Sequence, residues 1–135
     1  MPISMIMTKD LITLNFDDDL MIAEKLFNEN TIRHIPVVKG KSIVGMLSYT
    51  DLLRISFADV VDEHESEVDT IVYNMFTIEQ VMAKNLTKVS SNTTIKEVAE
   101  VLASKEFHAL PVVDNDELVG IVTTTDLINY LLDQY

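Results

Sequence analysis

The stretch Gly45-Met46-Leu47-Ser48-Tyr49-Thr50-Asp51 decides the fold, because it occurs again 75 residues later as Gly120-Ile121-Val122-Thr123-Thr124-Thr125-Asp126. Around it, residues 7–52 match residues 82–127 without a gap, and 11 of these 46 positions are identical. Most apolar positions between the identical ones keep an apolar residue. Self-similarity at a fixed offset is typical of repeated structural units. The chain therefore consists of two related halves that share one fold.

The first helix of each half is predicted from the spacing of its apolar residues. These recur at helical intervals in both halves, at Leu20, Ala23, Leu26 and Phe27 and again at Ile95, Val98, Val101 and Leu102. The aspartates 17–19 precede one helix and the polar residues 91–94 precede the other, so both helices have side chains that can cap their free amides. An acidic triplet also suits a metal ion, but the second half has no carboxylate there, which favours capping.

Two short strands and a second helix complete each half. The runs 35–38 and 43–47 are rich in branched residues and flank a turn at 39–42, which is typical of a hairpin. The corresponding runs, 110–113 and 118–122, flank a turn at 114–117. Thr50-Asp51 and Thr125-Asp126 are predicted to cap the helices that follow. With a strand before the first helix, each half has the order strand, helix, strand, strand, helix, which makes a mixed α+β fold.

Residues 54–77 have no counterpart in the repeat. An acidic run fills their middle, formed by Asp59, Asp62, Glu63, Glu65, Glu67 and Asp69. Apolar residues then recur at helical spacing, at Val68, Ile71, Val72, Met75 and Phe76, and predict an amphipathic helix packed on the second half. We therefore divide the chain into a first repeat at 1–58, a helical connector at 59–77 and a second repeat at 78–135.

The composition excludes several classes of protein. Among 135 residues, 22 are acidic and 10 basic, and the net charge of −12 disfavours binding to nucleic acids and anionic membranes. The 47% hydrophobic content is that of a globular chain. The absence of cysteine excludes disulfides, thiolate zinc sites and cysteine nucleophiles. No apolar stretch reaches the roughly 18 residues of a spanning helix, and we expect a soluble, cytoplasmic protein.

The repeated stretch resembles the closing motif of the cystathionine-β-synthase (CBS) domain. Two further pairs of segments resemble its opening and its central strand, namely Met7-Thr8-Lys9-Asp10 with Met82-Ala83-Lys84-Asn85, and Arg33-His34-Ile35-Pro36-Val37-Val38 with His108-Ala109-Leu110-Pro111-Val112-Val113. The resemblance covers nearly the whole chain except the connector and implies a stand-alone tandem pair, called a Bateman module. Such a module has two repeats, each a small three-stranded sheet with two helices, related by a pseudo-twofold axis. In this family the clefts between the repeats bind adenosine-containing ligands.

The resemblance also implies which residues form two ligand sites. In the first site, Asp51 matches the ribose-binding position, Ser48 and Thr50 the small hydroxyl positions, and Arg33 and His34 the positions that reach phosphate. The second site has Asp126, Thr123, Thr125, His108 and Ala109 at the same positions. Each site of the family borrows residues that lead into the other repeat, which are Thr77 and Ile78 for the first site and Pro2 and Ile3 for the second.

The chemistry of these residue types agrees with such a ligand. A carboxylate accepts two hydrogen bonds from vicinal hydroxyls, and the start of a helix favours phosphate oxygens. The alternative is that Asp51 and Asp126 only cap helices, since aspartate is a preferred cap. If the halves bind unequally, the first site is the better phosphate site, because Arg33 is a permanent cation and its counterpart is His108.

No catalytic motif is complete in the sequence. His64-Glu65 begins a metalloprotease motif that lacks its second histidine, and the glycines at 40 and 45 lack the lysine of a P-loop. We therefore expect neither an enzyme nor a metal site, but a regulatory module that binds an adenosine-containing ligand and signals to a protein partner. AMP, ADP, ATP, a cyclic dinucleotide and S-adenosylmethionine all fit. The alternative is a structural or protein-interaction module with empty or degenerate nucleotide clefts.

The second helix of each half carries more apolar residues than one face needs. They are Leu52, Leu53, Ile55, Phe57 and Val60 in the first half, and Leu127, Ile128, Tyr130, Leu131, Leu132 and Tyr135 in the second. An exposed apolar patch of this size is unusual on a monomer. We therefore expect a homodimer that pairs through these helices, although a partner protein could cover the same patch.

Overall fold

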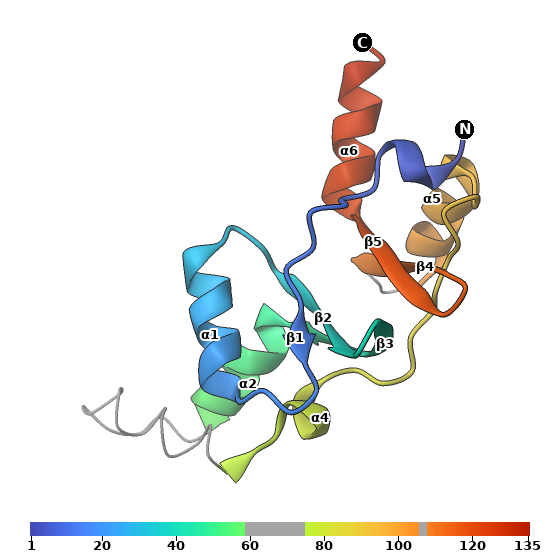
Figure 1. Ribbon diagram of the computed structural model, residues 1–135. Helices are drawn as coiled ribbons and strands as arrows, with labels where there is room; N and C mark the ends of the chain where they lie inside the picture. The colour runs from blue at the N-terminus through green and yellow to red at the C-terminus, as the bar shows by residue number, and fades with distance from the viewer. Residues whose placement is uncertain (59–74, 106–107) are drawn as a thin grey trace. The chain divides into compact units, whose positions relative to one another are not determined.

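The computed structural model describes residues 1–58, 75–105 and 108–135 (Figure 1). In chain order the elements are the 3₁₀ helix η1 (Ile3–Met5), β1 (Leu14–Asn15), α1 (Leu20–Glu29), β2 (His34–Lys39), β3 (Ser42–Ser48), α2 (Tyr49–Ala58), α4 (Ile78–Val81), α5 (Ile95–Ser104), β4 (Ala109–Asp114), β5 (Glu117–Thr123) and α6 (Thr124–Asp133). The first half thus follows the predicted order of strand, helix, strand, strand, helix.

The strand pairing is repeated between the halves. In the first half the sheet has the order β1-β2-β3, and β1 runs parallel to β2 with Leu14 opposite Val37. In the second half β4 and β5 are antiparallel, and Val89 makes a single parallel bridge to Val112. Val89 and Val112 are the counterparts of Leu14 and Val37, so the pairing is kept although the strand is reduced to one bridge. The predicted α+β fold is confirmed.

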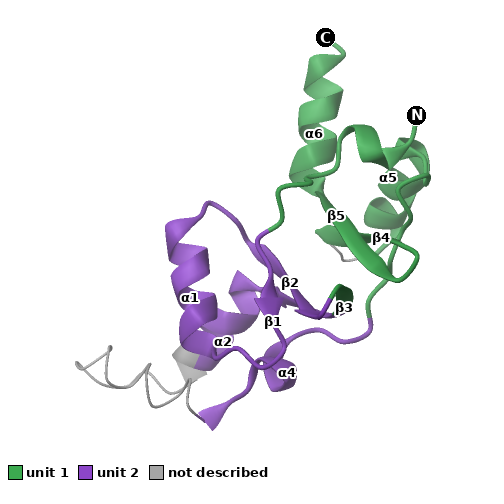
Figure 2. Cartoon of the chain, in the orientation of Figure 1, with its two compact units in different colours: residues 1–11, 41–43, 86–135 green, residues 12–40, 44–85 purple. Residues whose placement is uncertain are grey.

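The chain divides into two compact units that combine parts of both halves (Figure 2). Unit 1 contains residues 1–11, 41–43 and 86–135, and unit 2 contains residues 12–40 and 44–85. Each unit thus joins the helices and most of the strands of one half to the segment that leads into the other half. We call residues 1–11 and 77–85 the leading segments.

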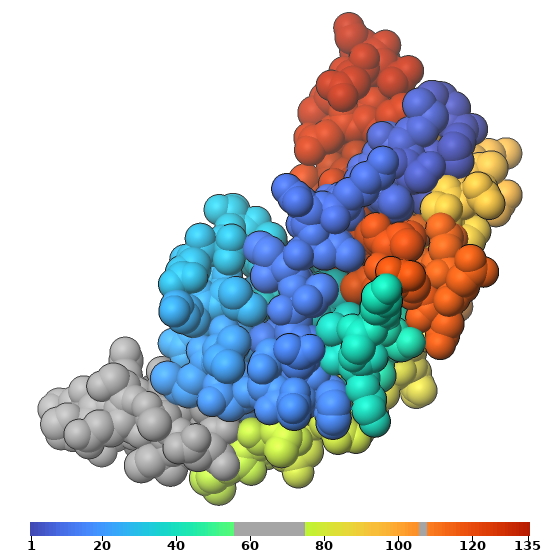
Figure 3. Space-filling model, in the orientation of Figure 1, coloured from blue at the N-terminus to red at the C-terminus, as the bar shows by residue number. Residues whose placement is uncertain are grey.

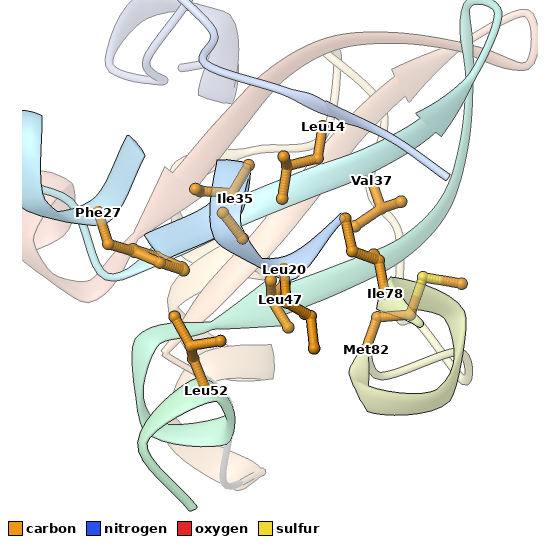
Figure 4. Packing of buried hydrophobic residues seen from close by; sticks show 10 residues of the cluster. Leu14, Leu20, Phe27, Ile35, Val37, Leu47, Leu52, Ile78 and Met82 are labelled. Atoms are coloured by element: carbon orange, nitrogen blue, oxygen red, sulfur yellow. The ribbon is translucent and has the colours of Figure 1, made fainter. Parts of the chain in front are cut away.

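Unit 2 has a core of buried apolar side chains, most of which are shown in Figure 4. Its members are Leu14, Leu20, Ala23, Phe27, Ile35, Val37, Leu47, Leu52, Ile78 and Met82. Ile78 and Met82 come from the leading segment, whose backbone is tied to β3 because Met46 and Ala83 exchange two N–H···O bonds of 3.0 and 2.9 Å. The glycine at position 45 gives Met82 its space, since a Cβ atom there would collide with the Met82 side chain.

Unit 1 repeats this arrangement around a second core. Its buried members are Ile3, Ile95, Val98, Leu102, Leu110, Val112 and Val122. Thr8 of the leading segment exchanges N–H···O bonds of 2.8 and 3.0 Å with Ile121 of β5. A Cβ atom on Gly120 would lie 2.7 Å from Sδ of Met7. Equivalent glycines in the two halves thus leave room for a methionine of each leading segment.

The helix caps agree with the sequence-based prediction at α1 and α5, the first helix of each half, and differ from it at α2 and α6, the second helix of each half. Asp19 caps α1 and Thr94 caps α5, so the capping prediction for these polar stretches is confirmed. The prediction that Thr50-Asp51 and Thr125-Asp126 cap α2 and α6 was wrong about which residue begins each cap, although the side chain of Asp126 does take part in the cap of α6. The strands continue directly into the helices, so Ser48 and Thr123, each the last residue of its strand, accept the capping hydrogen bonds.

The connector lies mostly outside the described residues. Of the predicted amphipathic helix, Val68, Ile71 and Val72 belong to the segment that the structure does not describe. Met75 and Phe76 are described and exposed. The predicted packing of this helix on the second half thus stays a prediction.

Helix α6 leaves an apolar face uncovered. Leu127 and Tyr130 pack against the core of unit 1. Ile128, Leu131 and Leu132, by contrast, are each more than half exposed, and α6 extends beyond the rest of unit 1 in Figure 3. In the described part of the chain no helix has the length and apolar character needed to cross a membrane.

Candidate functional site

Each unit brings several of its predicted site residues to the point where a strand turns into a helix. In unit 2, β3 ends at Ser48, and its Oγ accepts a hydrogen bond of 3.0 Å from the N–H of Asp51. The start of β2 lies beside this point, because the N–H of Tyr49 donates to the carbonyl oxygen of Arg33 at 2.8 Å. Two elements that are separate in the sequence thus place Arg33, Ser48 and Asp51 together.

Unit 1 has the same geometry with different side chains. The N–H of Asp126 donates to Oγ1 of Thr123 at 3.1 Å, and the N–H of Thr123 donates to Oδ2 of Asp126 at 3.0 Å. These reciprocal bonds form a capping box. The N–H of Thr124 donates to the carbonyl oxygen of His108 at 3.0 Å, which places His108 as Arg33 is placed in unit 2.

The two carboxylates are accessible at their helix starts. The Asp51 side chain is 27% exposed and forms an ion pair with Arg54, with 3.6 Å between Oδ1 and Nη1. An exposed pair of this kind contributes little to stability. Thr50 and Thr125 are exposed on the first turn of their helices. The helix dipole and the free amides of the first turn attract anions, so each place can hold phosphate oxygens as well as sugar hydroxyls.

The remaining residues of the predicted sites have different degrees of exposure. Arg33 and His108 are exposed, whereas His34 and Ala109 are half-buried. His34 takes part in an interaction within the chain. Only the first site has two cationic or titratable side chains at this place, because Ala109 stands where His34 does.

The leading segments bring the borrowed residues into the expected units. Thr77 caps α4, and its hydroxyl accepts from the N–H of Gln80 at 3.2 Å, so this oxygen already has one partner. Ile78 and Ile3 are fully buried in the cores of units 2 and 1. Pro2 is exposed and makes an isolated bridge to Thr94. Both isoleucines thus belong to the cores and present no accessible surface to a ligand in this structure.

Two residues near the carboxylates were not identified from the sequence. Arg54 follows Asp51 by three positions, a spacing at which helix side chains meet, and this signal could have found it. The hydroxyl of Thr8 lies 3.4 Å from both carboxylate oxygens of Asp126. No local pattern predicts this contact, because Thr8 reaches the site only through its pairing with Ile121. Groups of three or more metal-binding side chains are absent from the described residues.

Comparison with known sequences identifies the repeats. The model of the CBS domain family matches residues 3–58 and 78–133. The uncharacterized protein MJ1225 of Methanocaldococcus jannaschii is 26% identical over 124 residues, which are 91% of this chain and 44% of that protein. A CBS domain-containing protein of Dictyostelium discoideum is 26% identical over 133 residues, 96% of this chain and 90% of that protein. The chain thus spans less than half of one relative and most of the other.

Solved structures have the same fold. AcuB from Vibrio cholerae superimposes with a TM-score of 0.82 at 27% identity, covering 99% of this chain and 92% of that one. The CBS domain pair of protein MJ0100, in complex with 5′-methylthioadenosine and S-adenosyl-L-methionine, superimposes with a TM-score of 0.82 at 24% identity, covering 100% of this chain and 98% of that one. CBSX2 in complex with AMP superimposes with a TM-score of 0.80 at 22% identity, covering 98% of this chain and 97% of that one. At these last two identities the likeness concerns the fold alone.

Proposed function

Because the chain belongs to the CBS-domain family, with two copies in tandem, we propose that it is a regulatory module that binds adenosine-containing ligands. The observation that carries the proposal is the convergence of Arg33, Ser48 and Asp51 at one strand-to-helix point, repeated in unit 1. A carboxylate beside a helix start suits a ribose that bears phosphate, since the carboxylate accepts hydrogen bonds from the ribose hydroxyls and the helix start attracts the phosphate oxygens.

The ligand class is supported by proteins of the same fold. CBSX2 binds AMP, and MJ0100 binds 5′-methylthioadenosine and S-adenosyl-L-methionine. All three ligands share an adenosine moiety with sugar hydroxyls. We propose that this chain takes a ligand of the same class, with AMP, ADP, ATP, a cyclic dinucleotide and S-adenosylmethionine as the candidates.

The module is proposed to act without chemistry of its own and to pass ligand binding on to a partner protein. We also propose a homodimer, because Ile128, Leu131 and Leu132 leave an apolar face of α6 exposed and apolar faces of this kind are commonly covered by a second subunit. The second candidate function is a protein-interaction module with empty sites. It is favoured by one observation, that the carboxylate of Asp126 already serves a capping box.

A thermal-shift titration tests the proposed function directly. AMP at 100 times its dissociation constant stabilises a protein by about 2.7 kcal/mol, which gives a clear rise in melting temperature. Asp51→Ala removes an acceptor of the ribose hydroxyls, and we expect it to reduce the affinity of the unit 2 site by at least about tenfold. Asp17→Ala is the matched control, since Asp17 is an exposed carboxylate of the same unit outside the site.

The outcomes separate the two candidate functions. A melting temperature that no adenosine compound raises, in a folded protein, would support the interaction module. A shift that Asp51→Ala leaves unchanged would remove Asp51 from the site.

A further inference from the structure

The two carboxylates that are proposed to bind ribose have different partners within the chain. Asp126 receives a hydrogen bond from the Thr123 N–H at 3.0 Å, and the Thr8 hydroxyl lies 3.4 Å from both of its oxygens. Asp51 is paired with Arg54 at 3.6 Å, and the Arg54 side chain is 77% exposed. The Thr8 hydroxyl can donate its proton to either oxygen of Asp126, and it therefore competes with a sugar hydroxyl for the same acceptors.

Unit 2 offers no equivalent of the Thr8 hydroxyl, although its backbone is arranged in the same way. Thr8 pairs with Ile121 by two backbone hydrogen bonds, and Ala83 pairs with Met46 by two. Ile121 and Met46 occupy equivalent repeat positions, five residues before Asp126 and Asp51. Ala83 therefore stands toward Asp51 as Thr8 stands toward Asp126, but it has only a methyl group.

We propose that Thr8 competes with the ligand ribose for Asp126, so that the site of unit 2 fills before the site of unit 1. The inference rests on the proposed function and adds an order of affinity and the residue that sets it. The hydroxyl of Thr8 is an internal substitute for a ribose hydroxyl, and a ligand must displace it. The ion pair of Asp51 costs less to open, because Arg54 lies at the surface.

The charges around the two sites strengthen this order for ligands with phosphate. Unit 2 has Arg33 beside Ser48 and Arg54 beside Asp51. The same positions in unit 1 hold His108 and Asn129, so that unit has no permanent cation at either place. The affinity ratio between the sites is therefore larger for AMP than for adenosine, which lacks phosphate.

Isothermal titration calorimetry of the whole chain with AMP, and then with adenosine, tests the proposal. In Thr8→Val the competing hydroxyl is lost at nearly constant volume, and we expect the weaker site to bind AMP about three- to tenfold more tightly. In Ala83→Thr a hydroxyl is placed beside Asp51, and the tighter site is expected to weaken by a similar factor. Thr13→Val is the matched control, because Thr13 is exposed and outside both sites.

These variants are expected to fold, since Thr8 and Ala83 are exposed and pair through backbone atoms that the substitutions keep. If the wild type binds AMP at two sites and Thr8→Val leaves both constants unchanged, the role of Thr8 is refuted while the proposed function stands. If Ala83→Thr weakens the weaker site, the order of the sites is wrong. If no adenosine compound binds to the wild type, the proposed function itself fails.

Discussion

Gly45→Ala is expected to destabilise the protein through one contact, between β3 and the leading segment. A Cβ atom at this position would collide with Sδ of Met82 and lie 2.7 Å from its Cγ and 2.9 Å from its Cε. Carbon atoms in contact prefer a separation of about 3.5–4.0 Å, so the Met82 side chain or the whole segment must move. Overpacking of this kind costs about 1–3 kcal/mol.

The size of the effect can be followed by thermal unfolding. For a chain of 135 residues, a loss of about 2 kcal/mol corresponds to a fall in melting temperature of roughly 6–10 °C. The leading segment also carries Thr77, so AMP binding to unit 2 is expected to weaken together with stability. Both effects have a single cause, the displacement of the leading segment.

A double-mutant cycle with Met82→Ala isolates that contact. Met82→Ala alone leaves a cavity and costs about 2–5 kcal/mol, but it also makes room for the new Cβ atom. The cost of the double variant is therefore expected to fall short of the sum by about 1–2 kcal/mol. Gly40→Ala is the control, because its space is open and its cost comes from a φ of +67°. Strictly additive costs for Gly45→Ala and Met82→Ala would refute the reasoning.

Four other properties of the chain can be tested separately. Hydrogen bonds from the Ser91 hydroxyl and N–H lower the pKa of Asp114 below its usual 3.8, so the stability difference between the wild type and Asp114→Asn should be constant at neutral pH and shrink as the pH falls below about 4. His34 lies beside Arg33, and if it takes up a proton next to phosphate, AMP binding weakens from about pH 6 to 8; a flat profile would leave Arg33 alone in that role. Light scattering should give about twice the chain mass of 15.3 kDa, and a mass equal to one chain would contradict the homodimer. Thr50→Ala should weaken AMP binding while changing the free energy of unfolding by less than about 0.5 kcal/mol, and unchanged binding would exclude Thr50 from the site.

The fold could be predicted because the same signals occur twice. Helices α1 and α5 have apolar residues at the same repeat positions, and polar residues precede both of them. A pattern that occurs in both halves predicts the structure more securely than the same pattern in one half would. The starts of α2 and α6 were predicted two residues late, because Thr50 and Asp51 are themselves good caps. Local preference could not decide that Ser48 takes this role, since the decision depends on where β3 ends.

The candidate sites were predictable only in part. Arg33, Ser48 and Asp51 could be grouped because the repeated motifs resemble those of a known family, and Tyr49 binding to the Arg33 carbonyl brings them together. The contact of Thr8 with Asp126 joins residues 118 positions apart. Such a contact arises because each half packs against the leading segment of the other half, which no pattern within one half encodes.

The positions that are identical in the two halves separate into those that the fold needs and those that it does not. Val37 and Val112 are fully buried in their cores, and Gly45 and Gly120 make room for methionines, so packing explains both pairs. Thr50 and Thr125 are also identical, but both are exposed and neither caps its helix. A packing requirement therefore does not explain this pair. We propose that a ligand bound by both units explains this pair, with Thr8 and Ala83 setting how tightly each unit binds it.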